Sequence, residues 1–317
     1  MQNGFIQIYQ RNADAICGEL TAGLLASSAW ISPKYLYDGL GSRLFAAICE
    51  LPEYYPTRTE ALIVEHYRSD IARSTGRGMT LIDLGAGNCE KAARLFPEIQ
   101  PAHYVPIDIS IDFLRESVES LRHRFPQVRM TGLGMDFSHS LDLPEAVPSQ
   151  KRLFFYPGSS IGNFTPEEAV AFLGRMRDAC RADGGLLIGV DLVKREDLLQ
   201  DAYDDAIGLT AAFNLNLLQH LNHLLKADFR PRDWRHVSRF NARESRIELH
   251  LEARREVRVA WEGGSRHFAQ GERIHTENSY KYTPERFLQM LERAGFGRVS
   301  RWIDPHGWFM LCHARAG

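Results

Sequence analysis

An acidic loop with two glycines, Asp83-Leu84-Gly85-Ala86-Gly87-Asn88, is the chain's clearest candidate for ligand-binding chemistry. Glycines at such positions let the backbone turn tightly and approach a nucleotide closely. A pyrophosphate cradle of the G-x-G-x-x-G type needs a third glycine, but Glu90 occupies that position. The loop therefore favours a nucleotide-like ligand without phosphates. Taken alone, the two glycines are equally typical of a tight turn between a strand and a helix.

Two acids further along the chain supply acceptors that an adenosine needs. Asp108 lies 21 residues after Gly87 (108 minus 87), at the end of the next expected strand, where its carboxylate can accept from both ribose hydroxyls. Asp136 can accept from an adenine amino group, with the Phe137 ring beside the base, although a lone aspartate is also typical of a turn. S-adenosylmethionine fits this set as cofactor, whereas NAD needs pyrophosphate contacts that Asn88-Cys89-Glu90 does not offer.

The elements that must position these residues alternate between apolar strands and helical stretches, the pattern of βαβ units around a parallel sheet. The expected strands cover 80–84, 104–108, 153–156 and 186–191. A capping box predicts that a helix begins at Thr165, and the same Thr-Pro-Glu signal recurs at Thr283. Strands over 298–303 and 308–313 then close the chain as a hairpin. This order is typical of the α/β, Rossmann-like sheet of class I S-adenosylmethionine methyltransferases.

Residues near 194 to 282 interrupt this alternation and indicate a second α+β domain. They open with a helical stretch that ends near Leu225 and continue as strands of period two. Ile247, Leu249 and Leu251 alternate with polar residues, which predicts a half-buried antiparallel strand. We expect residues 257–261 to pair with that strand.

Composition bounds the class of protein. The 317 residues include 38 Lys and Arg against 40 Asp and Glu, and a net charge of -2 gives no general attraction to nucleic acid or anionic membranes. Five scattered cysteines predict neither disulfides nor a zinc site, and no metal is expected at His220 and His223, which lack a matching carboxylate. No membrane span or signal peptide is evident, so we expect a cytoplasmic protein with a small-molecule partner. The oligomeric state stays open, and a monomer is compatible with the sequence.

Several long, uncommon strings resemble the histidine Nα-methyltransferases of ergothioneine biosynthesis, which make hercynine. The strings run in family order and are Tyr37-Asp38 with Gly41-Ser42, LPEYYPTR (51–58), YVPID (104–108), PGSSIGNF (157–164), YDD (203–205), AFNLN (212–216) and TENSYKY (276–282). The resemblance implies trimethylation of the α-amino group of L-histidine with S-adenosylmethionine. It also implies a methyltransferase domain of residues 59–193 plus 284–317 and a substrate-binding domain of residues 10–58 plus 194–283.

The resemblance assigns roles to single residues. Tyr37 and Asn163 would act on the amine as catalytic residues, with Asn163 and Tyr203 also holding the α-carboxylate. The substrate-binding set is Tyr54, Asn163, Tyr203, Leu249, Glu277 and Ser279. The cofactor-binding set is Gly85, Gly87, Lys91, Asp108, Asp136 and Phe137. Methyl transfer from a sulfonium is an in-line displacement that depends mainly on positioning, and the sequence identifies no base for the amine proton.

Specificity is expected to depend on Glu277. A carboxylate that accepts from an imidazole N–H makes a charge-assisted hydrogen bond, and an indole lacks the second polar nitrogen that Ser279 could use. On composition alone, Glu277 is more typical of an outward strand carboxylate paired with Arg or Lys.

Three positions depart from the family pattern. Leu249 replaces a methionine beside the imidazole, Ser160 replaces a threonine, and Asn88-Cys89 replaces a Thr-Ser type pair. The first keeps open an Nα-methyltransferase of another aromatic amino acid, such as tryptophan. A catalytically silent ligand-binding homologue is a third possibility, against which the intact Asn163 and Tyr37 count.

Overall fold

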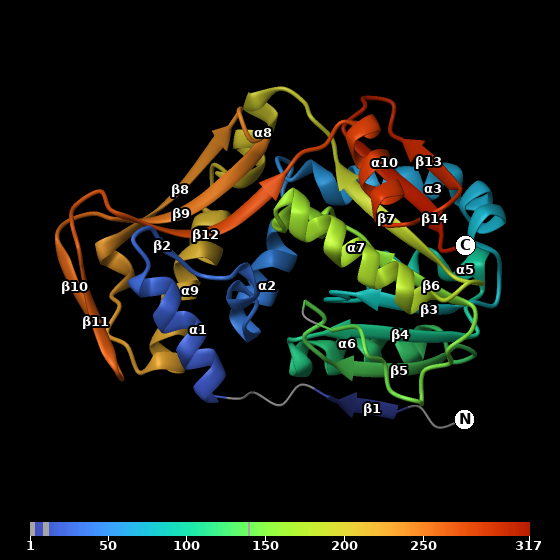
Figure 1. Ribbon diagram of the computed structural model, residues 1–317, viewed down its shortest axis with the longest axis horizontal. Helices are drawn as coiled ribbons and strands as arrows, with labels where there is room; N and C mark the ends of the chain where they lie inside the picture. The colour runs from blue at the N-terminus through green and yellow to red at the C-terminus, as the bar shows by residue number, and fades with distance from the viewer. Residues whose placement is uncertain (1–3, 9–12, 139) are drawn as a thin grey trace. The chain divides into compact units, whose positions relative to one another are not determined.

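The structure is a computed structural model that describes residues 4–8, 13–138 and 140–317. Its internal contacts divide the chain into two compact units, whose elements are labelled in Figure 1. Among the described residues, unit 1 comprises 4–8, 56–138, 140–194 and 280–317, and unit 2 comprises 13–55 and 195–279. The chain therefore leaves unit 1 after Lys194 and returns to it at Tyr280.

Unit 1 is built on a mixed sheet that confirms the predicted class I methyltransferase order. In the described part of the chain the sheet has eight strands in the order β1-β5-β4-β3-β6-β7-β14-β13. The strands are β1 (Gly4–Gln7), β3 (Thr80–Leu84), β4 (His103–Asp108), β5 (Arg129–Gly134), β6 (Arg152–Tyr156), β7 (Gly185–Asp191), β13 (Val299–Ile303) and β14 (Phe309–Arg315). Neighbours from β1 to β7 are parallel, and β14 runs antiparallel to β7 and β13. The sequence had indicated no strand at β1.

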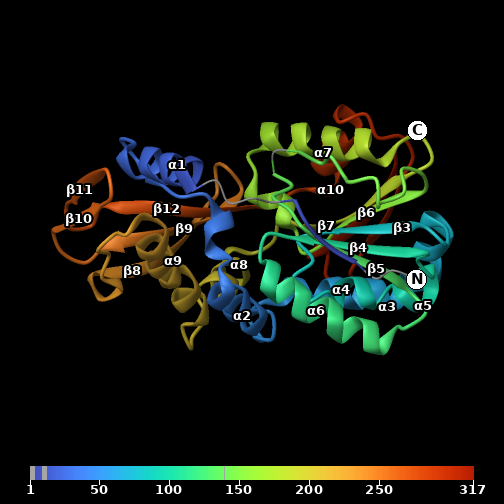
Figure 2. The same cartoon turned by 90° about the horizontal axis from the view of Figure 1, so that it is seen from below.

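Helices cover both faces of this sheet, as Figure 2 shows. One face carries α7 (Pro166–Cys180) and α10 (Pro284–Arg293), and the other carries α3 (Tyr55–Thr75), α4 (Glu90–Ala93), α5 (Phe96–Ile99) and α6 (Ile111–Arg124). The capping box predicted for α7 is confirmed, because the Thr165 hydroxyl accepts from the Glu168 N–H while the Thr165 N–H donates to the Glu168 carboxylate. Every residue of β3, β6 and β7 is buried, as expected of parallel strands covered on both faces.

The strand order creates a switch point beside β3. The chain continues from β3 to β4 and β5 on one side, whereas β6 lies on the other side of β3. Loops at the carboxyl ends of strands next to such a point form the usual ligand crevice of open α/β sheets. The glycine loop follows β3 and the segment 157–164 follows β6, so both segments start at this edge.

Unit 2 combines helices with a smaller sheet. Among the described residues this sheet has four strands in the order β2-β12-β9-β8, which are β2 (Ala29–Trp30), β12 (Arg273–Tyr280), β9 (Arg246–Ala253) and β8 (Trp234–Asn241). Its helices are α1 (Ala13–Leu25), α2 (Gly39–Ile48), α8 (Glu196–Tyr203) and α9 (Leu209–Leu225), with short 3-10 turns η1 (Pro33–Leu36) and η3 (Pro231–Asp233). The α9 helix packs on β8 and β9.

One predicted strand pairing is wrong. Residues 257–261 do form a strand, β10 (Val257–Trp261), but its partner is β11 (Gly264–Phe268) and not β9. The Glu262-Gly263 turn, in which Gly263 has a φ of 92°, joins β10 directly to β11 as a hairpin. The short turn therefore determines the partner of β10, although the alternation of apolar and polar residues had favoured pairing with β9. The β9 strand pairs with β8 instead.

Candidate active site

The glycine loop of unit 1 has the backbone shape that its sequence predicts. Gly85 and Gly87 adopt φ values of 69° and 51°, a left-handed region that favours glycine. The loop is tied to β4 because the N–H groups of Gly85 and Ala86 both donate to the Ile107 carbonyl, at 2.9 and 3.1 Å. No atom lies within 4 Å of the position that a Cβ on Gly87 would take, so the loop leaves open space there.

Asp108 is held in place by the loop that it faces. Its Oδ2 accepts from the Gly87 N–H at 3.0 Å, and its Oδ1 accepts from the Ser110 N–H at 2.9 Å. Burial raises the pKa of Asp108, and these backbone hydrogen bonds oppose the rise. A carboxylate oxygen can accept more than one hydrogen bond, so both oxygens keep capacity for a diol.

Asp136 and Phe137 lie on the segment that follows β5. The Phe137 ring is near Gly85, since a Cβ on that glycine would lie 3.8 Å from Phe137 Cζ. It also stacks on Phe172 with ring centroids 6.0 Å apart. The Asp136 carboxylate accepts from the Ser138 N–H at 2.9 Å and from its hydroxyl, which is the turn geometry that competed with an adenine contact.

Lys91 is partly exposed and forms an ion pair with a buried carboxylate that the sequence did not reveal. Its Nζ is 2.9 Å from Glu60 Oε2, and the Glu60 side chain is only 3% exposed. The same carboxylate accepts from the Gly158 N–H at 2.9 and 3.2 Å. Glu60 therefore joins α3, the helix after the glycine loop and the segment after β6. No spacing in the sequence signals this, because the three groups are far apart along the chain.

A second acid to which the sequence assigned no role, Asp83, lies near the end of β3 directly before the glycine loop. It is 1% exposed, and Tyr104 donates to its Oδ2 at 2.7 Å. Its Oδ1 has no hydrogen-bond partner among the described residues. Burial raises the pKa of this carboxyl to about 7, although the hydrogen bond from Tyr104 opposes the rise. A nearby positive charge lowers the pKa of such an acid and so favours its ionised form.

Asn163 ends the 3-10 turn η2 (Ser160–Asn163) that follows β6. Gly162 fits this turn closely against the strand end of β12, since a Cβ there would lie 2.8 Å from the Tyr280 carbonyl oxygen. Asn163 is half-buried, and its side-chain amide makes no hydrogen bond within the described part of the chain. The amide can therefore serve a ligand without breaking an internal bond.

The predicted substrate residues of unit 2 gather in an aromatic cluster. Tyr37 packs against Phe45 and Phe213 with ring centroids 5.5 Å away in each case. Tyr54 packs edge-on against Phe45 at 6.0 Å and against Tyr203 at 6.1 Å. Burial raises the pKa of the Tyr54 phenol well above its ordinary value. Tyr54 therefore stays neutral and able to donate.

Local hydrogen bonds fix the segment that carries Tyr37. Asp38 caps α2 by accepting from the Gly41 N–H at 2.7 Å, and the Asn216 amide of α9 donates to the same oxygen at 2.7 Å. Gly41 is required, because a Cβ there would lie 1.9 Å from the Leu36 carbonyl oxygen. The strings around Tyr37 and in α9 therefore act together to hold this turn.

Tyr203 is fixed in a similar way at the end of α8. His236 of β8 contacts its carbonyl oxygen at 2.9 Å, and its hydroxyl is 2.7 Å from Ser279 Oγ. Asp205, two residues later, caps α9 by accepting from the Leu209 and Thr210 N–H groups. The string YDD thus combines one side chain of the cluster with a helix cap.

Glu277 and Ser279 face the interior of unit 2. Buried and more exposed residues alternate along β12 as far as Thr276. Glu277, the next residue, is also buried, and the alternation continues from it to Ser279, so that Glu277 and Ser279 are 8% and 5% exposed. Glu277 also raises the pKa of the Tyr54 phenol, after the larger effects of burial, Tyr203, Cys49 and Tyr37. Its burial excludes the alternative of an outward, solvated carboxylate. Leu249 is 1% exposed, and its carbonyl accepts from the Thr276 hydroxyl at 3.0 Å.

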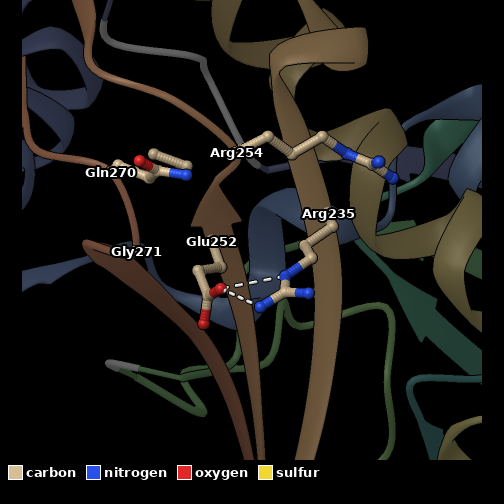
Figure 3. Close-up of a pocket in the computed structure, with 6 residues that line it drawn as sticks. Arg235, Glu252, Arg254, Gln270 and Gly271 are labelled. Atoms are coloured by element: carbon tan, nitrogen blue, oxygen red, sulfur yellow. Dashed lines mark hydrogen bonds and ion pairs between the residues drawn. The ribbon is translucent and has the colours of Figure 1, made fainter.

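Two further features lie outside the residues assigned to the cofactor and the substrate. His220 bonds to the Tyr35 carbonyl oxygen at 2.8 Å, and within the described residues no cluster of His, Cys, Asp or Glu is arranged to hold a metal. A pocket of about 400 Å³ in unit 2 is lined by Arg235, Glu252, Ala253, Arg254, Gln270 and Gly271 (Figure 3). Its carboxylate already pairs with Arg235, and no residue predicted from the sequence lines it.

Comparison with known proteins places this arrangement in a family. Residues 16–316 match the family described as histidine-specific, SAM-dependent methyltransferases. The chain belongs to this family. It is 39% identical over 305 residues to the histidine N-alpha-methyltransferase of Mycolicibacterium smegmatis, covering 94% of each chain, and 36% identical over 304 residues to that of Mycobacterium tuberculosis, again covering 94% of each. It is also 30% identical to ergothioneine biosynthesis protein 1 of Neurospora crassa, over 88% of this chain but 33% of that protein.

As a histidine-specific methyltransferase, the chain uses S-adenosylmethionine as its methyl donor. The donor set beside β3 fits that molecule. Asp108 offers acceptors for a ribose diol, and Gly87 borders open space. The N-terminus of α4 carries Glu90 in its first turn, and a negative charge there disfavours a phosphate.

Proposed function

We propose that this methyltransferase trimethylates the α-amino group of L-histidine and so produces hercynine. The observation that carries the proposal is the buried group of Glu277, Ser279, Tyr54 and Tyr203 in unit 2. In this group the Tyr203 hydroxyl bonds to Ser279 and the Tyr54 ring packs on Tyr203. A buried carboxylate beside neutral hydroxyls suits a ring that has one N–H donor and one further polar nitrogen.

Unit 1 would bind the cofactor and unit 2 would supply most of the groups that bind the amino acid. For the cofactor we assign Gly85, Gly87, Lys91, Asp108, Asp136 and Phe137, to which the structure adds Glu60 and Asp83 as neighbours. S-adenosylmethionine, when bound, supplies a methyl group on a positively charged sulfur. The raised pKa of Asp83 supports its ability to ionise beside such a charge.

The protein's own task in the reaction is to position the amine. Asn163, through its half-buried amide, and Tyr203 would hold the α-carboxylate and orient the amine, and Tyr37 would hydrogen-bond the amine. The amine must be neutral for each transfer, so histidine with an ammonium group loses three protons as it gains three methyl groups. None of the assigned residues is a strong base, so we expect these protons to leave through water.

Glu277 would choose histidine over larger rings. An indole offers a single N–H and no second polar nitrogen, so it can make only one of the two polar ring contacts that this group offers to an imidazole. The loss of one hydrogen bond costs roughly 0.5–1.5 kcal/mol. Leu249, which replaces a methionine in the family pattern, changes the shape of the pocket wall but adds no polar requirement.

The pathway and compartment extend the same proposal. The similarity to ergothioneine biosynthesis protein 1 of Neurospora crassa supports a place in ergothioneine biosynthesis. The five cysteines are free thiols, which supports a reducing cytoplasm. Within the described residues, no helix is both long and apolar enough to cross a membrane.

A product assay tests the function. Purified enzyme is incubated with S-adenosylmethionine and each of the twenty protein amino acids in turn, and the products are weighed by mass spectrometry. We expect histidine alone to gain three methyl groups efficiently. Faster turnover of tryptophan or tyrosine than of histidine would show that another aromatic amino acid is the preferred substrate. Ligand binding measured by calorimetry, without any product, would show a catalytically silent homologue.

A further inference from the structure

A buried charge cluster in unit 1 consists of residues to which the site described above assigns no role. The Asp191 carboxylate pairs with two ammonium groups, since Lys281 Nζ lies 2.8 Å from its Oδ2 and Lys194 Nζ contacts its Oδ1. Asp191 and Lys281 are each 1% exposed, and the Lys194 side chain is 3% exposed. Replacing a buried ion pair by apolar groups is often neutral or stabilising, so stability alone does not explain the cluster.

The two lysines mark the two places where the chain crosses between the units. Lys194 is the last residue before the chain leaves unit 1, and Lys281 is the second residue after it returns. Lys281 follows Glu277 by four residues and Ser279 by two (281 minus 277 and 281 minus 279). One carboxylate therefore holds both crossings, including the end of the strand that carries the proposed imidazole-binding residues.

Hydrogen bonds of the backbone connect the cluster of Asp191, Lys194 and Lys281, here called the anchor, to the segment that carries Asn163. The Asp191 N–H donates to Ser159 Oγ at 2.9 Å, and the Tyr282 N–H donates to the Asp191 carbonyl at 3.1 Å. Gly162 lies against the Tyr280 backbone so closely that a Cβ would not fit. The turn that ends in Asn163 and the end of β12 are thus fastened to the same residue.

Electrostatics keeps the anchor charged. Burial alone would raise the pKa of Asp191, but Lys281 and Lys194 outweigh burial and hold that pKa below its ordinary value. Burial lowers the pKa of Lys194 to about 8, against the opposing effect of Asp191. With two ammonium groups on one carboxylate, removal of either lysine leaves a balanced pair.

We propose that the Asp191–Lys281 ion pair is a positioning device for substrate recognition, which fixes the end of β12 so that Glu277 and Ser279 are held in place to bind the ring of the amino acid. This inference rests on the proposed function. It makes Asp191 and Lys281 positioning residues, because neither would touch the substrate. Lys194 would only balance the cluster, since the nearest proposed substrate residue after it, Tyr203, is nine residues away (203 minus 194).

Two matched variants, Lys281→Met and Lys194→Met, test the inference in the full-length enzyme. Each removes one ammonium group and leaves Asp191 with one partner, so the change in charge is the same. We expect Lys281→Met to raise the KM for histidine about tenfold more than Lys194→Met does. The Kd for S-adenosylhomocysteine, measured by calorimetry, should stay within about twofold of wild type in both variants.

A double-mutant cycle with Glu277→Gln separates positioning from general loss of stability. If Lys281 acts through Glu277, Lys281→Met should raise KM by less than about threefold once Glu277 is already replaced. Equal effects of the two lysine variants, or full additivity with Glu277→Gln, would overturn the inference. Should the wild-type enzyme prefer another amino acid, the proposed function fails, and the same comparison with that amino acid still decides the role of Lys281.

Discussion

At the scale of single residues, burial decides which common side chains can do specific chemistry. Glu277 is one of many acids on strands, yet it is 8% exposed and contributes to the raised pKa of the Tyr54 phenol. Asp83 is likewise buried at the end of β3, where its Oδ1 lacks a partner among the described residues. The sequence predicts Glu277 through the resemblance of TENSYKY to a family, whereas Asp83 and Glu60 required the fold.

Replacing Glu277 tests the proposed recognition of imidazole. A charge-assisted hydrogen bond contributes roughly 1.5–3 kcal/mol, so we expect Glu277→Gln to raise the KM for histidine about 10-fold to 100-fold. Steady-state kinetics with varied histidine measures the change. The Kd for S-adenosylhomocysteine should not change, because its proposed ligands lie in unit 1.

The matched control is Glu256→Gln, which alters an exposed glutamate in the turn before β10. We expect this variant to keep the wild-type KM within about twofold, since surface substitutions have small effects. If Glu277→Gln has the same KM for histidine as the control variant, Glu277 does not bind the substrate.

The raised pKa of Asp83 gives a pH test of stability. The unfolded carboxyl ionises near its ordinary pKa of about 3.9, whereas the folded one ionises near about 7. Between these values the folded state binds the extra proton, so this contribution to stability falls as pH rises and is lost as pH passes through 7. Asparagine carries no such proton. We expect Asp83→Asn to gain roughly 3 kcal/mol of unfolding free energy relative to wild type between about pH 5 and pH 7.5.

Urea unfolding of the ligand-free enzyme across that pH range measures the difference. Asp112→Asn serves as control, because Asp112 is exposed in the first turn of α6. Its difference from wild type should stay flat with pH. A flat difference for Asp83→Asn as well would show that the Asp83 carboxyl ionises normally in the fold.

At the scale of elements, the sequence predicts a helix start correctly where one short string of residues contains all the groups that form the cap. The capping box at Thr165 and the cap at Thr283 start α7 and α10 where the sequence predicts, because each cap needs only its own first turn. The partner of β10 was wrong because alternation identifies a strand but not its neighbour. In β12, two consecutive residues, Thr276 and Glu277, are buried, and the alternation of apolar and polar residue types does not predict this break in the burial pattern.

The close fit of η2 against β12 gives a prediction at this scale. In Gly162→Ala the new Cβ would meet the Tyr280 carbonyl at 2.8 Å, and the short turn with Asn163 must shift. Displacement of a positioning group is costly to catalysis, so we expect kcat/KM for histidine to fall about tenfold or more. Initial-rate kinetics and a thermal unfolding curve of the variant provide the measurement.

Gly174→Ala in α7 makes the same chemical change where nothing lies within 4 Å of the new Cβ. We expect unchanged activity and a gain of about 0.5–1 kcal/mol in stability, because alanine favours a helix over glycine. Equal activity of the two alanine variants would contradict the role assigned to the contact between Gly162 and Tyr280.

At the scale of the whole molecule, we propose that the two units divide the tasks of binding the cofactor and binding the amino acid. Sequence patterns predicted the sheet of unit 1 because apolar strands and helix caps recur there at regular spacing. They could not show that Asp191 fastens both chain crossings, since Lys194 and Lys281 are separated by all of the inserted segment. Long-range ion pairs of this kind become visible only in the fold.

Cofactor choice is testable on the intact chain. A ligand at about 100 times its Kd stabilises the folded state by about 2.7 kcal/mol. We expect S-adenosylhomocysteine at that excess to raise the thermal unfolding midpoint, and NAD at the same concentration to leave it unchanged. A midpoint raised by NAD alone would contradict the phosphate-free interpretation of the glycine loop.

The central claim is that three methyl groups go to the α-nitrogen of histidine. The most direct measurement is the NMR spectrum of the product formed from histidine and S-adenosylmethionine labelled with carbon-13 in its methyl group. The account predicts one resonance from three equivalent methyl groups, correlated through nitrogen to the histidine Cα. Labelled methyl groups on an imidazole nitrogen, or a final product with fewer than three on the α-nitrogen, would contradict it.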